Sequence, residues 1–247
     1  MSIKLAILNC YDSNHPKTLF NYSGKNLSES ELLYSRVSSF PMISAESFNV
    51  FSDDFPNKKF DAFIISGSYY NPDRDSILSY SWMQKLLSFI RSAHEKAIPQ
   101  LGICFGHQMI AVAFGGKVFK LPEIEAGFRK INLTDEGMKN RLFQNIKSSF
   151  FGVFFHNWAV YRSSLPFDSN ILALSPKIPD QATSFSIGKS TYAVQFHPER
   201  VSGDVKIMFD SRKKSLNGAK FNLSESSDAN LKVLENFLLS LKNQHNI

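Results

Sequence analysis

The sequence has few cysteines and no long apolar run. Only Cys10 and Cys104 are present among 247 residues, too few for a disulfide framework. The apolar segment Ile3–Cys10 is too short to cross a membrane, and no small-residue cleavage site follows it. These absences predict a cytoplasmic protein of a reducing compartment that is not associated with a membrane.

A strong excess of one charge is also missing. The 28 Lys and Arg residues exceed the 22 Asp and Glu residues by only six. Arg212-Lys213-Lys214 is the only basic triplet, and it lacks the interleaved aromatic residues of nucleic-acid-binding motifs. We interpret this triplet as a solvated helix face and predict no nucleic-acid partner.

The common cofactor and metal motifs are absent as well. Neither a Gly-x-x-x-x-Gly-Lys-[Ser/Thr] loop nor a Gly-x-Gly-x-x-Gly turn occurs, and residues 113–117 fit neither pattern. The histidines outside the motifs discussed below show no metal-ligand spacing, and we expect His107 to be a packed helix residue. The sequence therefore predicts no cofactor and no metal site.

Apolar strand-like segments are present, and they alternate with helical ones. Hydrophobic residues make up 43% of the chain, enough for the core of one domain that spans residues 1–247. Strands are expected at 3–10, 48–51, 60–66 and 99–103, and helices at 28–40, 77–97 and 106–114. A capping box formed by Ser28 and Glu31 marks the start of the first helix. This alternation predicts an α/β fold with a mainly parallel sheet between two layers of helices.

The second half of the chain has a different pattern. Short strand segments are expected at 129–133, 149–155, 171–174, 182–187 and 191–196, so antiparallel strands should be added to the sheet. The polar stretch 203–229 is interpreted as a mobile excursion ahead of a final amphipathic helix.

The segment Gly102-Ile103-Cys104-Phe105-Gly106 lies between a predicted strand and a predicted helix. It is the cysteine counterpart of the Gly-x-Ser-x-Gly nucleophile elbow, in which glycines two residues away on either side leave room for a strained turn. A sulfur at a helix N-terminus is also favoured as thiolate by the helix dipole. A buried, inert cysteine in a tight turn is the alternative interpretation of this segment.

A second motif follows the last predicted strand as His197-Pro198-Glu199. A histidine near Cys104 could take the thiol proton and return it to a leaving amine, while a carboxylate fixes the tautomer of the imidazole. Alone, this tripeptide would be interpreted as a polar turn.

Together the two motifs resemble those of the class I, or triad, glutamine amidotransferases, and further segments resemble the stand-alone members that are similar to GMP synthase. The motif segments are 102–108 and 195–199, segment 64–68 is similar to the glycine loop of the family, and the further segments are 125–128, 133–137 and 172–175. The resemblance implies a flavodoxin-like three-layer α/β/α fold and a Cys104, His197, Glu199 triad. It also implies an oxyanion hole from the backbone near Gly67 and Phe105.

The same resemblance implies a substrate site. Gln108 matches a glutamine that holds the substrate, and the loop with Asn157 and Trp158 matches one whose backbone meets the amino-acid end of the substrate. Relatives that use glutamine often have glycine where Asn157 stands.

Cleavage of the γ-carboxamide of glutamine is the function that these residues predict, through a γ-glutamyl thioester. The ammonia could pass to a separate synthetase partner. The altered residue at 157 keeps open a γ-glutamyl peptidase that acts on glutathione-like γ-glutamyl amides. A glutamine-sensing or regulatory subunit of the same fold is the non-enzymatic alternative.

Overall fold

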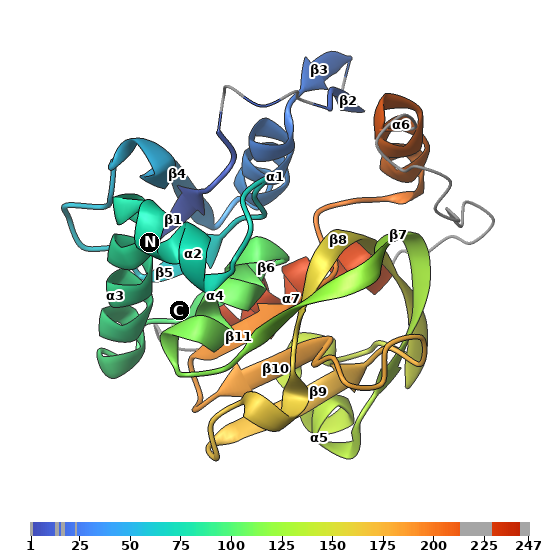
Figure 1. Cartoon of the computed structure of the whole chain (residues 1–247). Helices are drawn as coiled ribbons and strands as arrows, with labels where there is room; N and C mark the ends of the chain where they lie inside the picture. Colours follow the sequence, from blue (N-terminus) through green and yellow to red (C-terminus); the bar gives the residue numbers. More distant parts are fainter. Residues whose placement is uncertain (1, 13–14, 16–17, 23, 213–228, 243–247) are drawn as a thin grey trace.

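A single nine-stranded sheet forms the centre of the computed structural model, which describes residues 2–12, 15, 18–22, 24–212 and 229–242 (Figure 1). The strand order is β4 (Ile43–Asn49), β1 (Ile3–Asn9), β5 (Ala62–Ile65), β6 (Gln100–Ile103), β11 (Thr191–Val194), β10 (Ser184–Ile187), β9 (Ser169–Leu174), β7 (Val118–Leu133) and β8 (Ser149–Val160). The first five strands are parallel to one another. From β11 onward each strand is antiparallel to its neighbour.

Helices cover both faces of the parallel part of the sheet. On one face α1 (Glu29–Ser38) and α7 (Ala229–Lys242) pack against Leu5 and Ile7. On the other face α3 (Ser81–Glu95) and α4 (Phe105–Ala113) pack against Leu8 and Cys10. Successive side chains of a strand point to opposite faces, so β1 supplies both cores. The predicted three-layer α/β/α class, with antiparallel strands added in the second half, is confirmed.

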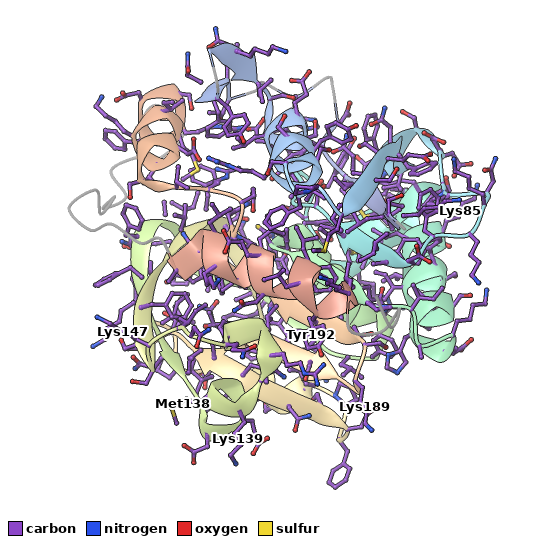
Figure 2. The ribbon with its side chains drawn as sticks, turned by 180° about the vertical axis from the view of Figure 1, so that it is seen from behind. Lys85, Met138, Lys139, Lys147, Lys189 and Tyr192 are labelled. Carbon is purple, nitrogen blue, oxygen red and sulfur yellow. The ribbon has the colours of Figure 1, made fainter. Side chains whose placement is uncertain are left out.

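Figure 2 shows α7 lying across the rear face of the sheet, beside Tyr192 of β11. The ring of Tyr192 meets that of Phe237 in α7 at a centroid distance of 6.4 Å. The predicted final amphipathic helix is therefore a layer of the main core.

The smaller elements gather around this frame. They are the hairpin β2 (Phe20–Tyr22) and β3 (Lys25–Leu27), the short helices α2 (Arg74–Ser79) and α5 (Asp135–Lys139), the helix α6 (Ser202–Arg212), and 3-10 turns at 50–52, 141–143 and 162–164. Phe20 of the hairpin and Met208 of α6 share a small apolar cluster with Val153 of β8. In Figure 1 the hairpin and α6 lie on the same side of the molecule, above the ends of β7 and β8.

Several predicted boundaries are corrected by the structure. The strand expected at 48–51 runs from Ile43 to Asn49; this edge strand has only one buried residue, so its hydrophobic pattern is weak. The helix expected at 77–97 is two helices, separated at Tyr80 by extended backbone. The capping box is present, with the Ser28 N–H donating to Glu31 Oε2 at 2.8 Å.

Two further corrections concern the second half of the chain. The strands expected at 129–133 and 149–155 belong to the much longer β7 and β8, whose pairing is interrupted between Lys120 and Glu125. Of the excursion expected at 203–229, the described part is helix α6, and residues 213–228 lie outside the described residues.

Candidate active site

Cys104 lies at the junction of β6 and α4, where it is the N-cap of the helix. Its φ of 53° and ψ of −99° are unusual for a residue with a side chain. A Cβ at Gly102 would lie 2.5 Å from the Gly106 carbonyl oxygen, and one at Gly106 would lie 2.4 Å from that of Ile65. The two glycines therefore permit the sharp turn that the sequence predicted.

His197 and Glu199 follow β11, the strand next to β6. Nδ1 of His197 lies 2.7 Å from Oε1 of Glu199, and the two side chains are 3% and 4% exposed. The neutral imidazole therefore carries its proton on Nδ1, and this N–H donates a hydrogen bond to the carboxylate. Nε2 is left as a proton acceptor.

Burial keeps both the Cys104 thiol and the His197 imidazole neutral. Burial raises the pKa of the Cys104 thiol to about 12; the Arg200 cation lowers it and the Glu199 anion raises it. Burial lowers the pKa of His197, as does Arg200, against the opposing effect of Glu199. The sequence-based expectation that the helix N-terminus favours thiolate is therefore outweighed by desolvation in the free protein.

Glu199 itself stays ionised. Burial alone would raise its pKa, but the charge and hydrogen bond of His197, together with Arg200, lower it overall. The Arg200 side chain is buried, its Nε lies 3.5 Å from Glu199 Oε1, and its guanidinium stacks 5.0 Å from the ring of Phe20. Arg200 was not predicted as a site residue, because its only signal in the sequence was its position directly after Glu199.

The two segments expected to supply oxyanion donors lie close to the elbow. The Phe105 N–H contributes a hydrogen bond that lowers the Cys104 pKa, so this group faces the sulfur. A Cβ at Gly67 would lie 2.3 Å from the Tyr11 hydroxyl and 3.3 Å from Cε1 of His197. Only glycine fits the Gly67 position as the chain is packed.

Cys104, His197 and Arg200 share one cavity of about 300 Å³. Its walls also include the three residues predicted to bind substrate, Gln108, Asn157 and Trp158. The Gln108 amide nitrogen already donates to the Trp158 carbonyl at 2.7 Å and to Gln195 Oε1 at 3.2 Å. Gln108 therefore holds the cavity wall with its nitrogen, and Trp158 is itself anchored through Nε1 to Asn71 Oδ1 at 3.0 Å.

His107 does not join this cavity. Its ring packs on Phe185 at 4.9 Å, and Nε2 meets the Ala182 carbonyl oxygen at 2.8 Å. The prediction that His107 is a packed helix residue is confirmed.

One end of the cavity is polar and aromatic, and no sequence motif predicted it. Arg212 of α6 lies over the ring of Tyr69 at 4.8 Å and that of Phe155 at 5.8 Å, and Nη2 donates to Glu29 Oε1 at 3.2 Å. Tyr11 adds an edge-to-face contact with Tyr69 at 5.2 Å. Arg212 is thus a cavity residue, which corrects its interpretation as part of a solvated face; Lys213 and Lys214 lie outside the described residues.

Comparisons with known proteins identify the family of this chain. The family model for class-I glutamine amidotransferases matches residues 17–213. γ-Glutamyl peptidase 4 of Arabidopsis thaliana is 30% identical over 77% of this chain and 75% of its own length. A glutamine-hydrolysing GMP synthase subunit of Saccharolobus solfataricus is 35% identical over 58% of this chain and 69% of its own length.

Solved structures show the same fold. A glutamine amidotransferase of Thermotoga maritima superposes with a TM-score of 0.72 over 98% of both chains at 17% identity. The chain belongs to the class-I glutamine amidotransferase family. It is a cysteine-dependent amidohydrolase of that type. Among the described residues, no helix is long and apolar enough to span a membrane.

Proposed function

We propose that the chain hydrolyses the γ-carboxamide of glutamine with Cys104 as nucleophile, His197 as proton carrier and Glu199 as the carboxylate that orients it. The proposal rests on one observation: Cys104 at the elbow shares a cavity with His197, and Nδ1 of this histidine lies 2.7 Å from the Glu199 carboxylate.

The reaction begins with a neutral pair. His197 Nε2 takes the thiol proton as the sulfur attacks the γ-carbonyl carbon, and an oxyanion forms. The N–H groups of Phe105 and of the backbone near Gly67 are the proposed donors to this oxyanion, each worth roughly 3 to 4 kcal/mol in such sites.

The carbon–nitrogen bond then breaks. The proton on His197 passes to the leaving nitrogen, ammonia departs, and a γ-glutamyl thioester remains on Cys104. Water, activated by the neutral imidazole, attacks this thioester and gives glutamate and the free thiol. Arg200 acts on both groups, because a nearby cation favours the thiolate and disfavours the imidazolium, which promotes transfer of the proton from His197 to the leaving nitrogen.

The direct test is turnover of glutamine by the purified protein, followed as release of glutamate. Cys104→Ala should abolish turnover and the thioester mass shift, whereas Cys10→Ala should leave both in place. Cys10 is a matched control because its thiol is also buried but lies at a different strand end, where it donates to the Leu8 carbonyl oxygen at 3.6 Å. Turnover retained by Cys104→Ala would remove Cys104 from the mechanism.

Larger γ-glutamyl amides are a second candidate substrate class. The cavity of about 300 Å³ reaches the lower end of the roughly 300–1,000 Å³ range of drug-sized ligand sites. Glutamine is much smaller than such ligands, and the end formed by Tyr69, Glu29 and Arg212 could hold the amine part of a γ-glutamyl peptide. The name of the Arabidopsis relative, γ-glutamyl peptidase 4, supports the same class.

A comparison of glutamine with a γ-glutamyl dipeptide separates the two candidates. If the dipeptide is the physiological class, its kcat/KM should exceed that of glutamine, and Arg212→Gln should reduce this ratio. If glutamine is preferred, Arg212→Gln should affect both substrates alike.

The fate of the ammonia is part of the proposal. Several relatives are named as one subunit of a glutamine-hydrolysing GMP synthase, so a separate synthetase chain is the proposed acceptor. Addition of a synthetase chain that binds this protein should raise the rate of glutamine turnover.

A further inference from the structure

The cavity wall rests on a second buried His–Glu pair that the proposed mechanism does not use. Glu125 on β7 and His156 on β8 lie opposite one another in the strand register. Nε2 of His156 is 2.9 Å from Glu125 Oε2, and the side chains are 2% and 1% exposed. Glu125 also accepts hydrogen bonds from Gln181 Nε2 at 3.2 Å and from the Ser175 hydroxyl at 3.5 Å.

The hydrogen-bond partners fix where the protons are. Nδ1 of His156 lies 2.7 Å from the Trp158 carbonyl oxygen, which can only accept, so Nδ1 carries a proton. Burial alone would raise the pKa of Glu125, but the hydrogen bond and charge of His156, with Gln181, lower it overall. His156 is therefore held between the Glu125 carboxyl group and the Trp158 carbonyl oxygen.

A chain of hydrogen bonds leads from Glu125 and His156 toward the elbow. The Trp158 carbonyl accepts from both His156 Nδ1 and Gln108 Nε2, each at 2.7 Å. Gln108 Nε2 also donates to Gln195 Oε1 at 3.2 Å, which turns the Gln195 amide nitrogen the other way. That nitrogen is buried without a hydrogen-bond partner among the described residues, and the Gln195 side chain lowers the pKa of the Cys104 thiol.

We propose that Glu125 and His156 are positioning residues that hold the Trp158 carbonyl, and with it the cavity wall of Asn157 and Trp158, in the geometry that binds the amino-acid end of the substrate. Neither residue takes part in bond breaking. The inference rests on the proposed function. An uncompensated buried charge is costly, so loss of one partner should displace the other and loosen the wall.

Glu125→Gln tests this role, because it removes the charge with little change of shape. Glu123→Gln is the matched control: the residue is exposed, lies two positions away on the same strand, and makes the same charge change. For Glu125→Gln we expect KM for glutamine to rise roughly tenfold or more, as for a lost charged hydrogen bond. We expect kcat to change by less than about threefold, since the proton carrier is untouched.

Two measurements do not depend on turnover. In ¹⁵N NMR of the histidine side chains, the His156 signals should be alike in the wild type and in Glu123→Gln and should move in Glu125→Gln, because the partner of Nε2 has changed. Alkylation of Cys104 by iodoacetamide should proceed alike in all three proteins, whereas labelling by a glutamine-like diazoketone should slow in Glu125→Gln alone.

If KM is unchanged in a folded but less stable Glu125→Gln, the pair serves stability alone and the inference is overturned; His156 signals that do not move in this variant would overturn it as well. If Glu125→Gln fails to fold, Gln181→Met removes only one donor to Glu125 and should raise KM about threefold; no rise would overturn the inference. A wild type that neither turns over glutamine nor reacts with the diazoketone would refute the proposed function, and the NMR result would still decide whether Glu125 and His156 interact.

Discussion

Nδ1 of His197 lies 2.7 Å from Oε1 of Glu199, and both side chains are buried. Glu199→Gln places an amide beside Nδ1, and the amide nitrogen can donate to it and thereby move the imidazole proton to Nε2. The imidazole would then be unable to accept the Cys104 proton. We predict a fall in kcat of roughly 10³- to 10⁴-fold, as for triads with the wrong tautomer, and little change in KM.

Steady-state hydrolysis of glutamine measures this effect, with Glu136→Gln on the exposed surface as the control. A fall of less than tenfold in Glu199→Gln would show that the carboxylate does not set the tautomer.

The elbow glycines give a second prediction. A methyl group at Gly102 or Gly106 would lie about 2.5 Å from a backbone carbonyl oxygen, a contact that no side-chain rotation relieves. Gly102→Ala and Gly106→Ala should each lower the free energy of unfolding by roughly 2–4 kcal/mol. Urea unfolding followed by circular dichroism measures the change.

Gly203→Ala is the control for the elbow substitutions. This glycine lies in helix α6 with no atom within 4 Å of the added methyl group, so the change should be neutral or stabilising by up to about 1 kcal/mol. Equal stability of all three variants would mean that the turn can relax without cost.

The elbow and the His-Pro-Glu motif could be predicted because each is local in sequence. Gly102, Cys104 and Gly106 are set by one turn, and His197 and Glu199 lie two residues apart at one strand end. The parallel sheet was predictable for the same reason, because strands and helices alternate along the chain.

The remainder of the site depends on pairs that are distant in sequence. Arg212 meets Glu29 across 183 residues, and each alone is typical of a solvated surface. Glu125 and His156 become partners only through the register of β7 and β8. An interruption in the pairing of these strands shifts that register. The ionisation of Cys104 was expected to follow the helix dipole, but burial dominates, and burial is a property of the whole fold.

The ionisation state of Cys104 predicts its chemical reactivity. Burial raises the pKa of this thiol to about 12, so the thiolate fraction should grow tenfold for each pH unit across the neutral range. The rate constant of alkylation by iodoacetamide should therefore rise steadily from pH 7 to pH 9. A plateau in this range would indicate a preformed thiolate and imidazolium pair.

The dependence of glutamine hydrolysis on pH should follow His197 instead. The pKa of His197 is lowered by burial and by Arg200, so the neutral base persists below the ordinary histidine range near 6.5. The acid limb of kcat/KM should lie below that pH, and Cys10→Ala should reproduce the wild-type profile. A midpoint above pH 7 would contradict the assignment of His197 as the base.

His107 should make stability depend on pH. Burial lowers its pKa to about 3, and although Nε2 meets the Ala182 carbonyl, Nδ1 has no hydrogen-bond partner among the described residues. The unfolded chain binds a proton at this residue below about pH 6.5, while the folded protein does not until near pH 3. The contribution of His107 to the free energy of unfolding is therefore fully present above pH 6.5 and is lost as the pH falls. At pH 5 the loss from this residue is about 2 kcal/mol.

His107→Gln removes this titration. At pH 7.5 the variant should be less stable by about 1–3 kcal/mol, because the hydrogen bond to Ala182 is weakened. Between pH 7.5 and pH 5 the variant should lose less stability than the wild type. Part of the dependence of stability on pH should remain in the variant, because the pKa of His197 is also lowered. Urea unfolding at the two pH values measures both effects. An equal loss in the two proteins would mean that His107 is protonated in the folded state, and the packing of its ring on Phe185 would then have to accommodate a buried cation.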